Sequence, residues 1–202
     1  MRRTEVLTLY KLIFDLMLVS LAVLMMMFVG VFQANAWASS EGVYEAWIAR
    51  YNSPENHEDV ANAVAVDGSG NVYVTGESYG GYATIKYNTD GNQLWVKHYN
   101  GPANLNDTAY AIAVDGSGNV YVTGDSQGDY ATIKYDTDGN QLWVNRYDHS
   151  VTSNATDVAY ALAVDGSGNV YVTGRSSGSS TLSDYATIKY DTDGNQLWVK
   201  RY

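Results

Sequence analysis

The ten-residue stretch DGSGNVYVTG occurs three times in this chain and is identical in every copy. The copies begin at Asp67, Asp115 and Asp165, and each is followed by YATIKY and then by TDGNQLWV. The tryptophans that close the first two units, Trp95 and Trp143, are 48 residues apart. Tandem units of this length are typical of repeat proteins, in which each unit buries one face against the next. The repeat therefore limits the fold more than any other feature of the sequence.

Each unit predicts four short β-strands separated by turns. In the first unit these strands are expected at residues 60–66, 71–76, 82–87 and 93–99. Val, Ile, Tyr, Thr and Trp dominate the segments, as they do in β-sheets, and the segments are short for helices. The glycines of DGSGN and TDGN suit the tight turns between strands. Four strands in a unit of this size are typical of one blade of a β-propeller.

The first strand of each unit is expected to be buried on both faces. In the first unit Ala61, Ala63 and Ala65 alternate with valines, so we expect the alanines to share one face. A strand that is apolar on both faces belongs between two layers. The inner strands of a propeller hold that position, and the tryptophan of the fourth strand would then fill the wider space between outer strands.

The first 38 residues predict a separate hydrophobic signal helix. Three positive residues, Arg2, Arg3 and Lys11, stand before the apolar run 16–32, and small residues follow that run. This order is that of an export signal with a cleavage site. The run is also long enough to span a bilayer, so an uncleaved signal anchor is the alternative. Both interpretations place the remaining chain outside the cytoplasm, secreted or at the cell surface.

Residues 39–202 are expected to form the repeat domain. Its blades are expected at about 59–99, 107–147 and 157–202. The stretch EAWIARYNSP is similar to QLWVKHYNGP of the first unit, so residues 44–51 are expected to form a leading strand. Propellers typically have ~4–8 blades, and three cannot close a ring. The chain is therefore expected to be part of a longer propeller or to close a ring by self-association.

The repeated pattern resembles a known family. AVDGSGNVYVTG, YATIKY and DTDGNQLWVK together are similar to the SBBP family of seven-bladed β-propeller repeats in exported bacterial and archaeal proteins. The resemblance covers nearly all of residues 43–202. It implies an all-β fold with about three blades of four antiparallel strands, in an extracellular or surface protein. It carries no catalytic motif that could be transferred to this chain.

The charge and the missing motifs exclude several classes of function. The chain has 22 Asp and Glu against 12 Lys and Arg and no cysteine. An acidic surface repels phosphate groups, so no nucleic-acid partner is expected, and a membrane would be met only through the N-terminal segment. No nucleophile elbow or phosphate-binding loop is present, and the three histidines do not recur at one repeat position. We therefore expect no catalytic residues, no cofactor and no enzyme.

Two kinds of turn could hold calcium. Each DGSGN turn offers three side chains that carry oxygen, Asp67, Ser69 and Asn71 in the first copy, whereas calcium takes ~6–8 oxygen ligands. The DTDGNQ turns resemble the start of an EF-hand loop, with candidate ligands at Asp136, Asp138, Asp191 and Asp193. Their glycine stands at the fourth position instead of the sixth, and no glutamate closes the loop. We favour a structural role for both turns.

A third candidate is a ring of carboxylates. Asp59, Asp107 and Asp157 each stand eight residues before a DGSGN turn, so a propeller would place them at one mouth of its channel. Such a ring could bind a cation or a basic ligand. The alternative, which we favour, is that each carboxylate accepts backbone hydrogen bonds at a loop end.

The loops between the repeated segments differ in every unit. Variable loops on a rigid scaffold often form binding surfaces. The sequence thus predicts an exported, non-enzymatic binding scaffold for a protein or a glycan at the cell surface. A structural spacer in a larger envelope protein, and part of an enzyme whose site lies in other blades, are the alternatives.

Overall fold

The structure is a computed structural model that describes residues 44–54, 56–102, 106–149, 156–177 and 183–202. The chain divides into two compact units, Met1–Glu45 and Ala46–Tyr202. The expected signal segment, residues 1–38, lies outside the described residues. Among the residues described, no helix is of a length and hydropathy that would let it cross a membrane.

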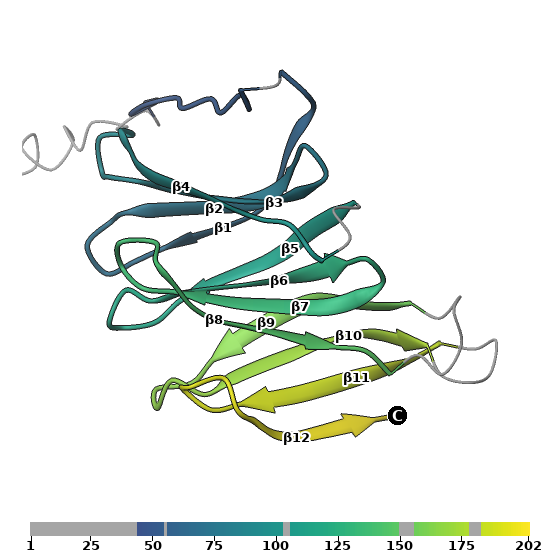
Figure 1. The fold of residues 1–202 in the computed structure, drawn as a ribbon. Coiled ribbons are helices and arrows are strands. Elements are labelled where there is room, and N and C mark those ends of the chain that lie inside the picture. The colour runs from purple at the N-terminus through teal and green to yellow at the C-terminus, as the bar shows by residue number, and fades with distance from the viewer. Residues whose placement is uncertain (1–43, 55, 103–105, 150–155, 178–182) are drawn as a thin grey trace, which may run out of the picture. The chain divides into compact units, whose positions relative to one another are not determined.

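In the described part of the chain, twelve β-strands form three antiparallel sheets of four strands each. The first sheet contains β1 (Asp59–Val66), β2 (Val72–Ser78), β3 (Gly81–Tyr87) and β4 (Gln93–Tyr99). The second contains β5 (Asp107–Val114), β6 (Val120–Ser126), β7 (Asp129–Tyr135) and β8 (Gln141–Tyr147). The third contains β9 (Asp157–Val164), β10 (Val170–Ser177), β11 (Ser183–Tyr190) and β12 (Gln196–Arg201). Within each sheet the strands pair in chain order (Figure 1), which confirms the predicted four-stranded blades.

The hydrophobic core lies between neighbouring blades. Each blade has one face that we call aromatic, with two tyrosines from its second and third strands and a tryptophan and a tyrosine from its fourth. In the second blade these residues are Tyr121, Tyr130, Trp143 and Tyr147. They pack on what we call the aliphatic face of the third blade, formed by Ala159, Leu162, Val164, Val170, Val172, Ala186, Ile188 and Tyr190. The first and second blades meet in the same way, so the blades stack face on face in chain order.

A bulge in the first strand of each blade decides which side chains reach that core. In β5 the pairing register shifts between Ala109 and Ala111, which inserts one extra residue and changes the alternation. Ala109 therefore packs in the same cluster as Ile112. The prediction that three alternate alanines share one face is therefore wrong for the alanine before the bulge, Ala109 here and Ala61 in the first blade, whereas the two alanines after the bulge share a face.

The last glycine of each DGSGNVYVTG copy is required by the same bulge. Gly124 pairs with Ala109 across the first two strands of the second blade. A Cβ atom on Gly124 would overlap the backbone carbonyl oxygen of Thr108. The equivalent glycines of the other blades, Gly76 and Gly174, face the same overlap.

The DGSGN segment forms the turn between the first two strands. In the first copy the Asp67 amide donates to the carbonyl oxygen of Asn71 and the Gly70 amide donates to that of Asp67, both over 3.0 Å. Gly70 has a φ of +82°, a conformation that favours glycine. The sequence predicted that both glycines of the turn serve the reversal, but only the second one has positive φ.

Candidate binding site on the two end faces

The junction between the first and second blades shows what an aromatic face requires of its partner. Trp95 Nε1 donates to the carbonyl oxygen of Thr137 over 3.1 Å, and Lys86 Nζ donates to the same oxygen over 3.2 Å. The hydroxyl of Tyr82 donates to the carbonyl oxygen of Ala131 over 3.3 Å. An aromatic face thus adds three directional bonds to its apolar burial.

The second junction repeats this arrangement. Trp143 and Lys134 both donate to the carbonyl oxygen of Thr192, over 3.2 and 3.0 Å, and Tyr130 donates to that of Ala186 over 3.2 Å. Lys134 Nζ also stands 5.3 Å from the centre of the Tyr121 ring, within range of a cation–π interaction. Two junctions with the same bonds indicate that blade faces are interchangeable.

The aliphatic face of the first blade is partly covered by residues 47–53, which we call the cap. Trp47 Nε1 donates to the carbonyl oxygen of Thr89 over 3.1 Å, the same bond that Trp95 and Trp143 make to the blades that follow them. Trp47 also lies against Tyr87, with ring centroids 6.0 Å apart. The cap therefore provides the side chains of a missing fourth strand.

The cap itself is no strand. Residues 44–51 belong to no sheet, because the described residues offer no preceding blade whose third strand they could pair with. The expectation of a leading strand is corrected in this respect, although its match to the fourth strand is reflected in the position of Trp47. Two further contacts hold the cap: Tyr51 to His98 Nε2 at 3.0 Å, and the Ser53 amide to Asp59 at 2.8 Å.

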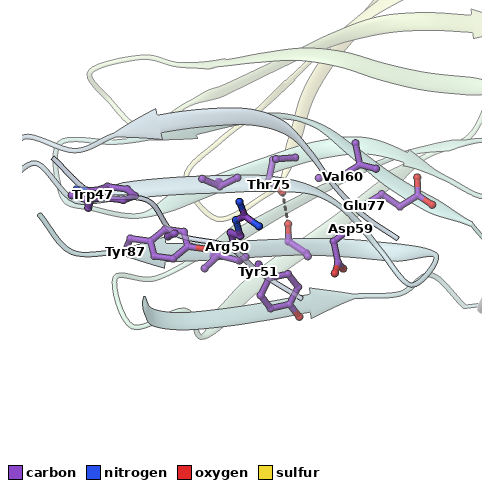
Figure 2. Close-up of a pocket in the computed structure, with 14 residues that line it drawn as sticks. Trp47, Arg50, Tyr51, Asp59, Val60, Thr75, Glu77 and Tyr87 are labelled. Atoms are coloured by element: carbon purple, nitrogen blue, oxygen red, sulfur yellow. Dashed lines mark hydrogen bonds between the residues drawn. The ribbon is translucent and has the colours of Figure 1, made fainter. Parts of the chain in front are cut away.

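A groove of about 440 Å³ lies beside the cap on this face. Figure 2 shows it with Trp47 and Tyr87 at one end and with Asp59 and Glu77 at the other. Its floor includes Val74, Ala83 and Ile85. In the internal junctions, tyrosines from the second and third strands of the preceding blade cover the equivalent residues. The groove therefore corresponds to the space that two tyrosines of a preceding blade fill at each internal junction.

The aromatic face of the third blade is exposed at the other end of the stack. It contains Tyr171, Tyr185, Trp198 and Tyr202, at the positions of the four aromatic residues of each other blade. Tyr185 is 56% exposed, whereas Tyr82 and Tyr130, in the same YATIKY sequence, are 0% exposed. Tyr82 and Tyr130 are buried by the next blade, whereas no described blade packs on Tyr185.

The aspartates of the DGSGN turns have their oxygens occupied by donors of the turn. Asp67 accepts from the amides of Ser69 and Asn71, from the side chain of Asn71 and from the hydroxyl of Tyr73, over 2.8–3.0 Å. Desolvation raises the pKa of Asp67, but these hydrogen bonds outweigh it and lower that pKa to about 2. The geometry is that of a self-contained turn.

The DTDGNQ turns have the same design. Asp136 accepts from the amides of Asp138 and Asn140 and from the side chain of Asn140, and Asp191 accepts the equivalent bonds from Asp193 and Asn195. The hydrogen bond from the side chain of Asn140, followed by the one from its amide, lowers the pKa of Asp136. The side chains of Asp138 and Asp193 are exposed.

The three aspartates expected at a channel mouth each accept a hydrogen bond from the connector before their blade. Asp59 accepts from the Ser53 amide, Asp107 from the Gly101 amide over 2.6 Å and Asp157 from the His149 amide over 2.7 Å. These contacts favour the structural interpretation of all three. Within the described ranges, no three or more His, Asp or Glu side chains gather closely enough to hold a metal ion.

Stacked four-stranded meanders with repeated junctions define the chain as a β-propeller repeat protein. A family model described as "Beta-propeller repeat" (SBBP) matches residues 47–83, 95–131 and 151–180, which together make up just over half of the chain. The chain belongs to this family, as the resemblance of its repeats implied. A search of curated proteins found no significant match.

Proposed function

We propose that this chain is an exported, non-enzymatic β-propeller module that acts as a binding scaffold, and that its ligand is a protein. The observation that carries the proposal is the groove on the aliphatic face of the first blade. Val64 and Val66 on that face are 65% and 61% exposed. Contiguous apolar surface of this kind marks protein interaction sites in soluble proteins.

The chemistry of the face favours a protein over a glycan. Its floor is aliphatic, and a partner can match it with apolar side chains, as the neighbouring blades do within the chain. A glycan would need several convergent polar groups, whereas the two carboxylates of the groove, Asp59 and Glu77, lie toward one end and Arg50 lies near its middle (Figure 2). The net charge of −10 argues against nucleic acid as the partner.

Site-specific photo-crosslinking in producing cells tests this proposal. A photoreactive amino acid replaces Val64 on the aliphatic face or, as the control, Leu142 of β8. Leu142 is 52% exposed although its blade has a neighbour on both sides. We expect a discrete protein adduct from position 64 and none from position 142. No adduct at either position would instead support the structural spacer.

Export has its own test. The proposal requires that residues 1–38 direct the repeat domain out of the cytoplasm. Protease added to intact spheroplasts should therefore digest the repeat domain while a cytoplasmic marker stays intact. A protected repeat domain would contradict export and leave the binding proposal to the crosslinking result.

A further inference from the structure

We propose that the partner of the end faces is a second copy of this chain. The aromatic face of β9–β12 in one copy docks on the aliphatic face of β1–β4 in the other and displaces the cap. This inference rests on the proposed function, because it names the protein that the scaffold binds. It assigns a ligand to the groove and a regulatory role to residues 47–53.

The complementarity of the two faces is already present twice inside the chain. The internal aromatic faces use a tyrosine, a tyrosine, a tryptophan and a tyrosine, and Tyr171, Tyr185, Trp198 and Tyr202 repeat that set. The internal aliphatic faces use positions that are filled in the first blade by Ala61, Val64, Val66, Val72, Val74, Ala83, Ile85 and Tyr87. A copy-to-copy junction would thus unite surfaces of the same composition and register as the two junctions that exist.

The polar groups of the two faces match as well. By analogy with the internal junctions, the hydroxyl of Tyr185 would donate to the carbonyl oxygen of Ala83, which lines the groove. Trp198 Nε1 and Lys189 Nζ would both donate to the carbonyl oxygen of Thr89. Lys189 already stands 5.0 Å from the centre of the Tyr171 ring, as Lys134 does over Tyr121. Lys189 therefore already has, in the single chain, the position that it would need in the junction between two copies.

The cap and the docking copy compete for one hydrogen-bond acceptor on the first blade. Trp47 donates to the carbonyl oxygen of Thr89, and Trp198 of a docking copy needs that same oxygen and the space above Tyr87. One of the two segments must give way. The cap belongs to no sheet, whereas β12 pairs with β11 from Ala186↔Arg201 to Tyr190↔Gln196. The cap has fewer bonds to lose, so it is the segment that leaves.

Two copies satisfy both ends at once. Each copy offers one aromatic and one aliphatic face, so head-to-tail contact generates a ring when the rotation closes. Two copies of the three described blades make six, within the typical range of ~4–8 blades, whereas three copies would exceed it. The expected assembly is therefore a closed dimer.

Sedimentation equilibrium of the protein, purified in the form that the producing cell makes, tests the inference. Tyr185→Asp and Val64→Asp each change an exposed residue of one face and should raise the dissociation constant by more than ~10-fold, because a desolvated charge is costly at an interface. Leu142→Asp is the matched control, at 52% exposure away from both faces, and should change it by less than ~2-fold. Circular dichroism confirms that each variant is folded.

The cap variant gives the most specific result. Trp47→Ala removes aromatic surface, yet it should lower the dissociation constant by about 10-fold, because it weakens the competitor of Trp198. If Trp47 only stabilised the first blade, its loss would not make two copies associate more tightly. If Trp47→Ala weakens the dimer instead, the cap belongs to the interface and its displacement is wrong.

Mixing the two broken variants tests the orientation. Val64→Asp retains an intact aromatic face and Tyr185→Asp an intact aliphatic face, so their mixture regains one head-to-tail junction and should form heterodimers that neither variant forms alone. If the mixture forms no heterodimers, the head-to-tail arrangement is wrong. If the parent and Trp47→Ala both remain monomeric, the second copy is not the partner. An adduct to a different protein at position 64 would then still support the proposed function.

Discussion

Two glycines in one turn are predicted to respond to alanine with opposite signs. In the DGSGN turn of the second blade, Gly118 has a φ of +82° and Gly116 has no positive φ. A Cβ atom on Gly118 would lie 2.9 Å from Cγ2 of Thr137, whereas one on Gly116 would meet nothing within 4 Å. Both glycines belong to the same five-residue turn. Each variant therefore serves as the control for the other.

The expected magnitudes follow from these geometries. Gly118→Ala places a side chain in the left-handed region, at roughly 1–2 kcal/mol, and adds crowding against Thr137 at roughly 1–3 kcal/mol. Together these lower the free energy of unfolding by about 2–5 kcal/mol. Gly116→Ala restricts the unfolded chain without strain in the folded one, and should raise that free energy by ~0.4–1 kcal/mol.

Thermal unfolding followed by tryptophan fluorescence measures both effects. For a domain of this size 1 kcal/mol corresponds to about 2–4 °C. The Tm should therefore fall by roughly 4–20 °C in Gly118→Ala and rise by about 1–4 °C in Gly116→Ala. Equal decreases in the two variants would refute the assignment of the reversal to the second glycine alone.

Two more predictions concern the aspartates of the turns. The hydrogen bond from the side chain of Asn169, followed by those from nearby amides, lowers the pKa of Asp165 to about 2, so its contribution to stability is present above the unfolded pKa of ~3.9 and is lost as the pH falls toward 2. Asp165→Asn should therefore flatten the decline of the urea midpoint between pH 5 and pH 2, and an unchanged slope would contradict this. Calcium should leave the Tm of the parent unchanged, because the oxygens of Asp67 and Asp136 already accept hydrogen bonds from their own turns. A calcium-dependent rise that Asp67→Asn abolishes would show a binding site.

Local patterns predicted the blades well because the determinants of a blade are local. Strand bounds agree with expectation to within one or two residues, since β-propensity and turn glycines act over a few positions. The place of the tryptophans was also predictable, because a large aromatic residue in an outer strand has to fill the gap between blades. Trp95 and Trp143 do so by reaching the turn of the next blade.

The errors arise where a residue depends on a distant partner. The bulge at β5 follows from the pairing of Ala109 with Gly124, and a strict alternation along one strand cannot reveal it. Local patterns also could not predict which faces of the blades are exposed. Nothing in YATIKY distinguishes the exposed Tyr185 from the buried Tyr130, because burial depends on whether another blade follows.

Sequence identity between blades has a physical consequence at the ends of the stack. A blade copied without change brings both an aromatic and an aliphatic face, and inside the stack each face finds its complement. Repeat arrays commonly protect their ends with altered, polar terminal units. Here the third blade keeps all four aromatic residues, and of the residues described outside the blades only the cap lies on the aliphatic face of the first blade. The same repetition that makes the internal junctions reliable therefore leaves two described faces without a described blade against them, the aliphatic face of the first blade and the aromatic face of the third, and the proposed binding rests on these faces.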